Sequence, residues 1–262
     1  PHPAVILSYP HLDSTNRLAR ELVLEGCAIG TVVLADNQSS GRGQYGRVFS
    51  SPVGGLYFTL ILAPDLPVSS LPLVTLATGL ACRETLHAAT GLSALIKWPN
   101  DLYLDGRKVA GILCESVVTP GDGQAPRVLV GVGVNVNSRI QDFPAEVQSI
   151  VTTVHEHLRE SLPLPELLPR FVRAISARVA MLRDYRASVL AEWQRFDYLF
   201  GKDIVCTAGA VVREGVAAGL TDEGRYRLRD ASGTVHEVIG GQLRLHSHPE
   251  AETRTLPPPP VS

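Results

Sequence analysis

The sequence predicts an α+β fold in which a mixed or antiparallel sheet is backed by helices and followed by a small β-barrel. Most of the expected strands follow one another with only a turn between them, which favours antiparallel pairing. Two long stretches carry the apolar spacing of helices. From residue 201 onward, short strands alternate with frequent glycines, a texture typical of a small barrel.

Composition limits the class of protein. The chain has 262 residues, 45% of them hydrophobic and 19% charged, which predicts one sizeable domain with a small appendage. A formal net charge of −2 argues against binding to nucleic acid, because such proteins carry a basic excess. No apolar stretch is long enough to cross a membrane, and no secretory signal is visible. The four scattered cysteines are expected to be reduced thiols, which indicates a cytoplasmic protein, or an organellar one if a leader was removed.

The first elements alternate between strand and helix. Residues 4–9, AVILSY, are expected to form a buried strand. A helix is expected to begin within 13–16, DSTN, with Asp13 or Ser14 as its N-cap. The apolar face of this helix is formed by Leu18, Leu22 and Val23. Further strands are expected at 30–36, 54–62, 93–104 (with an internal turn), 106–117 and 127–137.

Two longer helices complete the first unit. Leu71 to Thr90 has helical apolar spacing, and Gly91 follows as a stop signal. A helical connection rich in Leu, Arg and Ala is expected at 165–196. The expected domains are residues 1–198 and 199–247, and the Pro-rich tail 248–262 is expected to be disordered.

The stretch GRGQYGRVFSSP, residues 41–52, indicates a loop that an anion approaches closely. Glycines expose backbone N–H groups, and Arg42 and Arg47 lie among them. The loop lacks the GKS or GKT of a P-loop, and its G-x-G-x-x-G is followed by a strand rather than a helix. A mere tight turn is the alternative, but the two arginines favour a site for a carboxylate or phosphate.

A second cluster is KWPNDLYLDGRKVAG, residues 97–111. Pro99 fixes the turn, so polar side chains with different hydrogen-bonding capacities gather around one hairpin. These side chains belong to Lys97, Asn100, Asp101 and Lys108. A solvated surface hairpin is the alternative; it fits Asp105 and Arg107, but it fits Lys108 poorly because apolar VAGIL follows directly.

The stretch GVGVNVN, residues 131–137, has two interpretations. Its glycines could admit a flat ring while Asn135, an amide that both donates and accepts, bonds the edge of an adenine. A strand of small residues in a crowded core is the alternative. The pairs His155/His157 and His246/His248 have no ligand partners at metal spacing, so we expect both pairs to be exposed and expect no protein metal site.

Taken in order, DSTN, GRGQYGR with SSPVGGLYFTL, KWPNDLYLDGRKVAGIL and GVGVNVN resemble the catalytic domain of biotin–protein ligases (holocarboxylase synthetases) over about residues 4–140. Segment 201–246, with GRYRLRD and GGQLRL, is similar to the family's small C-terminal domain. The resemblance implies a fold related to class II aminoacyl-tRNA synthetases for the biotin- and ATP-binding domain and an SH3-like barrel after it. The family's repressors carry an N-terminal DNA-binding helix-turn-helix, for which this chain has no room, so a monofunctional form that binds no DNA is expected.

The resemblance also implies a two-step ligase reaction. Biotin and ATP form biotinyl-5′-AMP and diphosphate, and a lysine of a carboxylase's biotin carrier domain then attacks the adenylate and releases AMP. Mg²⁺ is expected to accompany ATP, with phosphate oxygens and waters as most of its ligands. The carrier domain is the expected partner, a homodimer stays open, and no membrane partner is expected.

Site residues follow from the same resemblance. Those expected to contact biotin are Ser14, Thr15, Asn16, Gln38, Gly41, Arg42, Gly43, Gln44, Lys108 and Gly111. Those expected to contact ATP are Arg42, Arg47, Lys97, Asn100, Asn135 and Asn137, with Arg42 to Gln44 wrapping the adenylate. The expected catalytic residues are Lys108, Asp101 and Arg42, and Asp101 is expected beside the attacked carbonyl.

Three other functions compete with this interpretation. A lipoate or octanoate ligase or transferase of related fold is disfavoured by the intact KWPND and RKVAG pair. A non-catalytic biotin or nucleotide sensor would be expected to lack Lys108 or the arginines, and a DNA-binding repressor is disfavoured by the charge. One departure stands out: the family commonly reads G-R-G-R where this chain has Gln44 as the fourth residue.

Overall fold

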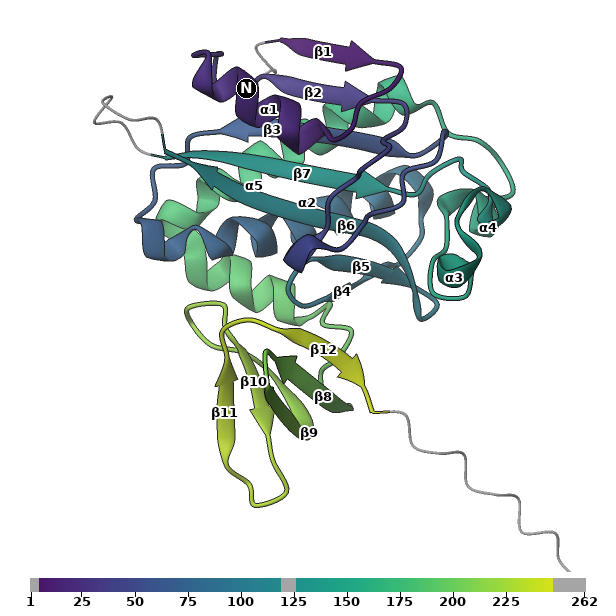
Figure 1. Cartoon of the computed structure of the whole chain (residues 1–262). Coiled ribbons are helices and arrows are strands. Elements are labelled where there is room, and N and C mark those ends of the chain that lie inside the picture. Colours follow the sequence, from purple (N-terminus) through teal and green to yellow (C-terminus); the bar gives the residue numbers. More distant parts are fainter. Residues whose placement is uncertain (1–4, 119–125, 247–262) are drawn as a thin grey trace, which may run out of the picture.

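The computed structural model describes residues 5–118 and 126–246. A seven-stranded sheet forms the larger part of the molecule (Figure 1). Its strands are β1 (Ile6–Tyr9), β2 (Val32–Ala35), β3 (Leu56–Leu62), β4 (Leu95–Lys97), β5 (Asp101–Leu104), β6 (Arg107–Val117) and β7 (Arg127–Val134). The spatial order is β1-β2-β3-β7-β6-β5-β4. β1 and β2 pair parallel and the other neighbours pair antiparallel, which confirms the predicted mixed sheet.

Helices cover both faces of this sheet. They are α1 (Thr15–Leu24), α2 (Pro72–Thr90), the short α3 (Ala145–Gln148) and α4 (Val154–Leu158), and α5 (Leu164–Gln194). Successive residues of β2 point to opposite faces: Val32 joins the core under α2 and α5, whereas Val33 joins the core under α1. Leu18 and Leu22 pack against that second core as predicted.

Local signals place the ends of two helices. Ser14 is the N-cap of α1, with an extended backbone, although its side chain makes no capping hydrogen bond. Gly91 ends α2 with φ 72°, a left-handed conformation that glycine adopts without strain. The prediction that residues 4–9 form a buried strand is wrong in one respect. β1 lies at the edge of the sheet, and Ile6 is 44% exposed, because only one side of an edge strand finds a partner.

The C-terminal part forms a second, five-stranded antiparallel sheet below the first (Figure 1). Its strands are β8 (Asp203–Ala208), β9 (Val211–Leu220), β10 (Tyr226–Arg229), β11 (Val235–Val238) and β12 (Gln242–Leu245), in the order β11-β10-β9-β8-β12. Its buried residues belong to the same hydrophobic cluster as α2 and α5. The two sheets therefore share one continuous core.

Polar contacts also join the two sheets. The indole Nε1 of Trp98 donates to the carbonyl of Gly224 at 3.1 Å, and the fully buried Tyr226 donates its hydroxyl to Asp197 at 2.7 Å. None of the described helices is both long and apolar enough to cross a bilayer. The predicted disordered tail, 248–262, lies outside the described residues.

Candidate functional site

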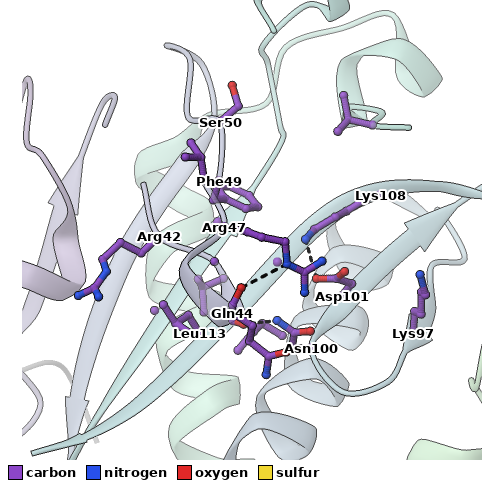
Figure 2. A pocket seen from close by; sticks show the side chains of 18 of the residues that line it. Arg42, Gln44, Arg47, Phe49, Ser50, Lys97, Asn100, Asp101, Lys108 and Leu113 are labelled. Atoms are coloured by element: carbon purple, nitrogen blue, oxygen red, sulfur yellow. Dashed lines mark hydrogen bonds and ion pairs between the residues drawn. The ribbon is translucent and has the colours of Figure 1, made fainter. Parts of the chain in front are cut away.

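A cavity of about 430 Å³ opens where the N-terminus of α1, the glycine loop, strands β4 to β7 and the turn before β12 meet. Figure 2 shows side chains from several of these segments around it. The predicted site residues that line it are Ser14, Thr15, Asn16, Gln38, Arg42, Gly43, Gln44, Arg47, Lys97, Asn100, Asp101, Lys108, Gly111 and Asn135. Stretches that lie far apart in the sequence thus form one site.

The glycine loop is a short hairpin that covers one side of the cavity. The amide of Gly43 donates to the carbonyl of Arg47 at 2.7 Å, and the amide of Phe49 donates to the carbonyl of Gly41 at 2.8 Å. Gly41 does not line the cavity. A Cβ there would lie 2.3 Å from the Phe49 carbonyl, so this glycine allows the two arms of the hairpin to meet. Its predicted contact with biotin stays a prediction.

The two loop arginines have different surroundings. Arg42 Nη1 lies 4.0 Å from Glu115 Oε1, and Arg20 lies 3.4 Å from the same oxygen. Arg47 donates through Nε to the carbonyl of Gln44 at 3.2 Å. In the view of Figure 2, Arg47 extends in the direction of Lys108 and Asp101, whereas Arg42 extends in the opposite direction. Arg47 is therefore the loop cation on the side of the hairpin cluster.

The hairpin cluster is held by an ion pair. Lys108 Nζ lies 2.6 Å from Asp101 Oδ1, and the two side chains are 26% and 20% exposed. Asp101 begins β5 and Lys108 lies on β6, so the strand pairing brings them together as the motif predicts. Figure 2 shows this pair beside Asn100 and Lys97. A cation and a carboxylate thus stand side by side in a partly water-excluded cavity.

Two more polar residues stand next to the pair. Asn100 donates through Nδ2 to the carbonyl of Ile112 at 2.8 Å, which fixes the turn against β6. Lys97 Nζ lies 3.3 Å from the hydroxyl of Tyr103 and 5.1 Å from the centre of its ring. Burial lowers the pKa of Lys97, and Asp101 opposes that shift by favouring the charged amine.

A second group of cavity-lining residues is uncharged and polar. Gln38 Oε1 accepts from the amide of Thr15 at 2.8 Å and from its hydroxyl at 3.2 Å, while Gln38 Nε2 donates to Ser51 at 2.8 Å. Asn16 is buried, and its Nδ2 donates to the Leu113 carbonyl at 3.2 Å and to Glu115 at 2.8 Å. Thr15 and Gln38 are therefore placed to contact a neutral polar group, whereas Asn16 holds α1 against β6.

Protein side chains approach the glycines of β6 and β7 closely. A Cβ on Gly133 would lie 2.4 Å from the Phe49 ring, and one on Gly131 would lie 2.2 Å from Asn16 Oδ1. Both glycines line the cavity, and the expectation that they admit the ring of a ligand stays a prediction. Because neither glycine has a side chain, the ring of Phe49 fits against Gly133 and the amide of Asn16 fits against Gly131.

The two asparagines after β7 differ. Asn135 is 3% exposed; its Nδ2 donates to the Thr152 carbonyl at 3.0 Å, and its buried Oδ1 has no donor among the described residues. This oxygen stays available on a residue that lines the cavity. Asn137 lies outside the cavity, and its amide is taken up by the backbone of Leu162, with bonds of 2.9 and 2.8 Å. These bonds give Asn137 a structural role, and its predicted contact with ATP stays a prediction.

The predicted exposure of the first histidine pair is also corrected. The His157 side chain is only 14% exposed; it contacts the Thr152 hydroxyl at 3.0 Å and lies 3.5 Å from Asp105. His155 is half-buried and contacts the carbonyl of Glu160 at 3.2 Å. Within residues 5–118 and 126–246, no three His, Cys, Asp or Glu side chains gather as a metal site. His248 lies outside those residues.

Sequence reasoning missed the contribution of the C-terminal sheet. Gly241, Gln242 and Leu243, from the turn into β12, line the cavity, as does Phe49. The consecutive glycines before β12 are a signal of close approach, but nothing in their spacing says which segment they approach.

Comparison with known proteins identifies relatives over most of the chain. Residues 9–135 match the Biotin/lipoate A/B protein ligase family. The bifunctional ligase/repressor BirA of Bacillus subtilis is 31% identical over 239 residues, which are 89% of this chain and 72% of that protein. The biotin–[acetyl-CoA-carboxylase] ligase of Paracoccus denitrificans is 32% identical over 84% of this chain and 92% of its own length. The biotin protein ligase of Aquifex aeolicus, solved in complex with biotin and ATP, superposes with a TM-score of 0.80 at 28% identity, covering 92% of this chain and 99% of that one.

Proposed function

This chain belongs to the biotin/lipoate A/B protein ligase family, and we infer that it is a biotin–protein ligase that activates biotin with ATP and transfers it to a lysine of a biotin carrier domain. One observation carries the assignment of residues. A single cavity has a neutral polar end at Thr15 and Gln38 and a charged end built on the Lys108–Asp101 ion pair.

The first step joins a carboxylate to the α-phosphate of ATP, so two anions must be brought together. Arg42, Arg47, Lys97 and Lys108 all line the cavity. Their positive charges offset the repulsion and stabilise the charge that develops on the phosphoryl oxygens. One preorganised contact of this kind is typically worth about 3 kcal/mol in the transition state. Lys108 is therefore assigned to the reacting centre.

The neutral end suits the uncharged polar part of biotin. Thr15 and Gln38 present a hydroxyl and an amide that are already fixed by hydrogen bonds to each other and to Ser51. Preorganised neutral groups hold a neutral ring without the cost of burying a charge. Biotin bound there would extend its carboxylate toward Lys108 and the glycine loop.

The adenine end is assigned to Asn135. Its buried Oδ1 is a free acceptor, and it suits the amino group of adenine, which must donate. Mg²⁺ would enter as the complex of ATP. Asp101 is ion-paired, and no three ligand side chains gather among the described residues, so phosphates and waters would supply most of the ligands.

The second step needs the neutral amine of the acceptor lysine beside the adenylate. Asp101 is the carboxylate of the charged end, and it is already engaged by Lys108. A carboxylate in this position is a weak base at neutral pH, so we assign Asp101 to orienting the amine and stabilising its developing charge. The same ion pair thus serves both steps.

The domain assignment is part of this proposal. Residues 1–198 would form the biotin- and ATP-binding domain, and 199–247 a small domain that contributes the turn before β12 to the cavity. The shared core supports a fixed contact between them. The carrier domain of a biotin-dependent carboxylase is the proposed partner, and a homodimer stays a prediction.

The test uses ATP radiolabelled at its α-phosphate. We expect label to appear in an adenylate only when biotin is added, and biotin to reach a carrier domain added afterwards. Lipoate in place of biotin is the matched control and should give no adenylate. Adenylate formed with lipoate, or none with biotin, would overturn the proposed substrate.

A further inference from the structure

A hydrogen bond joins the tip of the glycine loop to the C-terminal sheet. The amide of Gly241 donates to the hydroxyl of Tyr45 at 2.8 Å, although the two residues are 196 positions apart. On each side of this contact the chain lines the cavity, through Gly43 and Gln44 in the loop and through Gln242 at the start of β12. The bond therefore links two segments that face each other across one cavity.

Little else holds Tyr45 in place. Its side chain is 67% exposed, and its backbone has φ 58° and ψ 33°, a left-handed conformation that non-glycine residues avoid. The guanidinium of Arg47 lies 6.0 Å from the ring centre, at the limit of a cation–π contact. The hydroxyl bond to Gly241 is thus the directional contact that favours this conformation of the loop tip.

We propose that Tyr45 is a positioning residue that fastens the glycine loop to the C-terminal sheet and so retains the adenylate in the cavity. The proposal rests on the proposed function for the identity of the ligand. With the bond made, the loop cannot lift from the cavity without breaking it. Because Tyr45 itself is outside the cavity lining, it acts through the loop and does not touch the reacting atoms.

Gly240 offers a second way to disturb the same contact. Its backbone lies outside the left-handed region, so alanine fits the conformation. The added Cβ would lie 3.1 Å from the Tyr45 hydroxyl, and apart from the two chain neighbours of Gly240 no other described residue has an atom within 4 Å of it. Gly240→Ala should therefore push the hydroxyl away from Gly241, and should be harmless once that hydroxyl is gone.

The experiment compares wild type, Tyr45→Phe, Gly240→Ala, the double variant and the control Tyr185→Phe. Tyr185 is 62% exposed on α5, so the control removes an equally exposed hydroxyl elsewhere. Each protein is loaded with biotinyl-AMP, and release is followed by rapid filtration. We expect Tyr45→Phe to release the adenylate about twofold to tenfold faster, the range for one neutral hydrogen bond. Single-turnover adenylate formation should stay within about twofold, since no group at the reacting centre changes.

Gly240→Ala should accelerate release only when the Tyr45 hydroxyl is present. Equal acceleration in both backgrounds, or wild-type release from Tyr45→Phe, would overturn the proposal. If a variant forms the adenylate more slowly to the same extent that it releases it faster, the defect is a general structural one. That result would also overturn the proposal.

Hydrogen exchange in the ligand-free proteins separates this proposal from the proposed function. Tyr45→Phe should speed exchange of the Gly241 amide by a similar factor, and Tyr185→Phe should not. If wild type forms no biotinyl-AMP, the proposed function fails, while unchanged exchange at Gly241 would still overturn the Tyr45 contact.

Discussion

Lys108 Nζ lies 2.6 Å from Asp101 Oδ1, so the residues assigned to the two half-reactions form one ion pair. Both side chains are largely buried, and neither can be changed without altering the surroundings of the other. The following predictions separate their contributions and test the contacts around them.

Lys108→Ala should abolish adenylate formation and leave the fold intact. The charge serves the ligand, and Asp101, with a side chain 20% exposed, is not left as a fully buried unpaired charge. The measurement is biotinyl-AMP formed per enzyme, together with a thermal melt. Lys202→Ala, which removes a lysine stacked on Tyr198 away from the cavity, is the control and should be active. Normal adenylation by Lys108→Ala would remove this residue from the reacting centre.

Asp101→Asn should slow transfer to the carrier lysine more than it slows adenylate formation. The amide keeps the shape but loses the charge that orients the incoming amine, a loss of roughly 10²-fold for a group of this type. Single-turnover assays of the two steps give the two rates. Equal losses would mean that Asp101 acts on the nucleotide or its metal.

Lys97→Met should raise the stability of the ligand-free protein at neutral pH by roughly 1 kcal/mol and weaken the binding of ATP. Burial lowers the pKa of Lys97, which means that the fold disfavours its charge. As the pH rises toward 10.5, the ordinary pKa of a lysine, the unfolded chain binds more protons than the folded one. The free energy of unfolding of the wild type therefore rises relative to that of the variant.

The measurement is the difference in melting temperature between wild type and Lys97→Met at neutral pH and near pH 10.5. The exposed Lys202→Met is the matched control and should show no such trend. If the difference in melting temperature does not become smaller as the pH rises, the lowered pKa of Lys97 is not its cause.

Gln44→Arg should slow the release of biotinyl-AMP. Gln44 lines the cavity and offers only neutral hydrogen bonds, whereas arginine adds charge-assisted ones of about twice the strength. The gain corresponds to roughly 1 to 2 kcal/mol in retention. Preloaded proteins are compared by rapid filtration. Release as fast as wild type would show that the side chain at position 44 does not face the adenylate.

Tyr226→Phe should destabilise the joint between the two sheets by about 1–3 kcal/mol at neutral pH, because Asp197 loses its hydroxyl partner in a largely buried place. Burial raises the pKa of Asp197, and the Tyr226 hydrogen bond lowers it, so the variant raises it further. The penalty should shrink as the pH falls toward the ordinary value of 3.8, where the carboxyl takes up a proton. The measurement is a thermal melt of both proteins at neutral pH and near pH 3.8. A loss of stability that is the same at both pH values would exclude Asp197 as its source.

The sequence determined most of the elements and most of the predicted site residues that line the cavity, because both depend on short-range patterns. Short continuous apolar runs predict β2 and β3, and Gly91 ends α2 because glycine adopts the left-handed conformation without strain. Asp101 and Lys108 meet because a short hairpin brings them together whatever surrounds it.

Only the tertiary structure decided which distant residues of the chain each exposed or glycine-rich segment contacts. Phe49 covers Gly133, Asn137 turns to Leu162 instead of the cavity, and Gly241 reaches Tyr45 across 196 positions. Spacing along the chain fixes the direction of a side chain relative to its own strand or helix. The surface that it faces depends on how distant elements pack into one continuous core, and no local pattern encodes that choice.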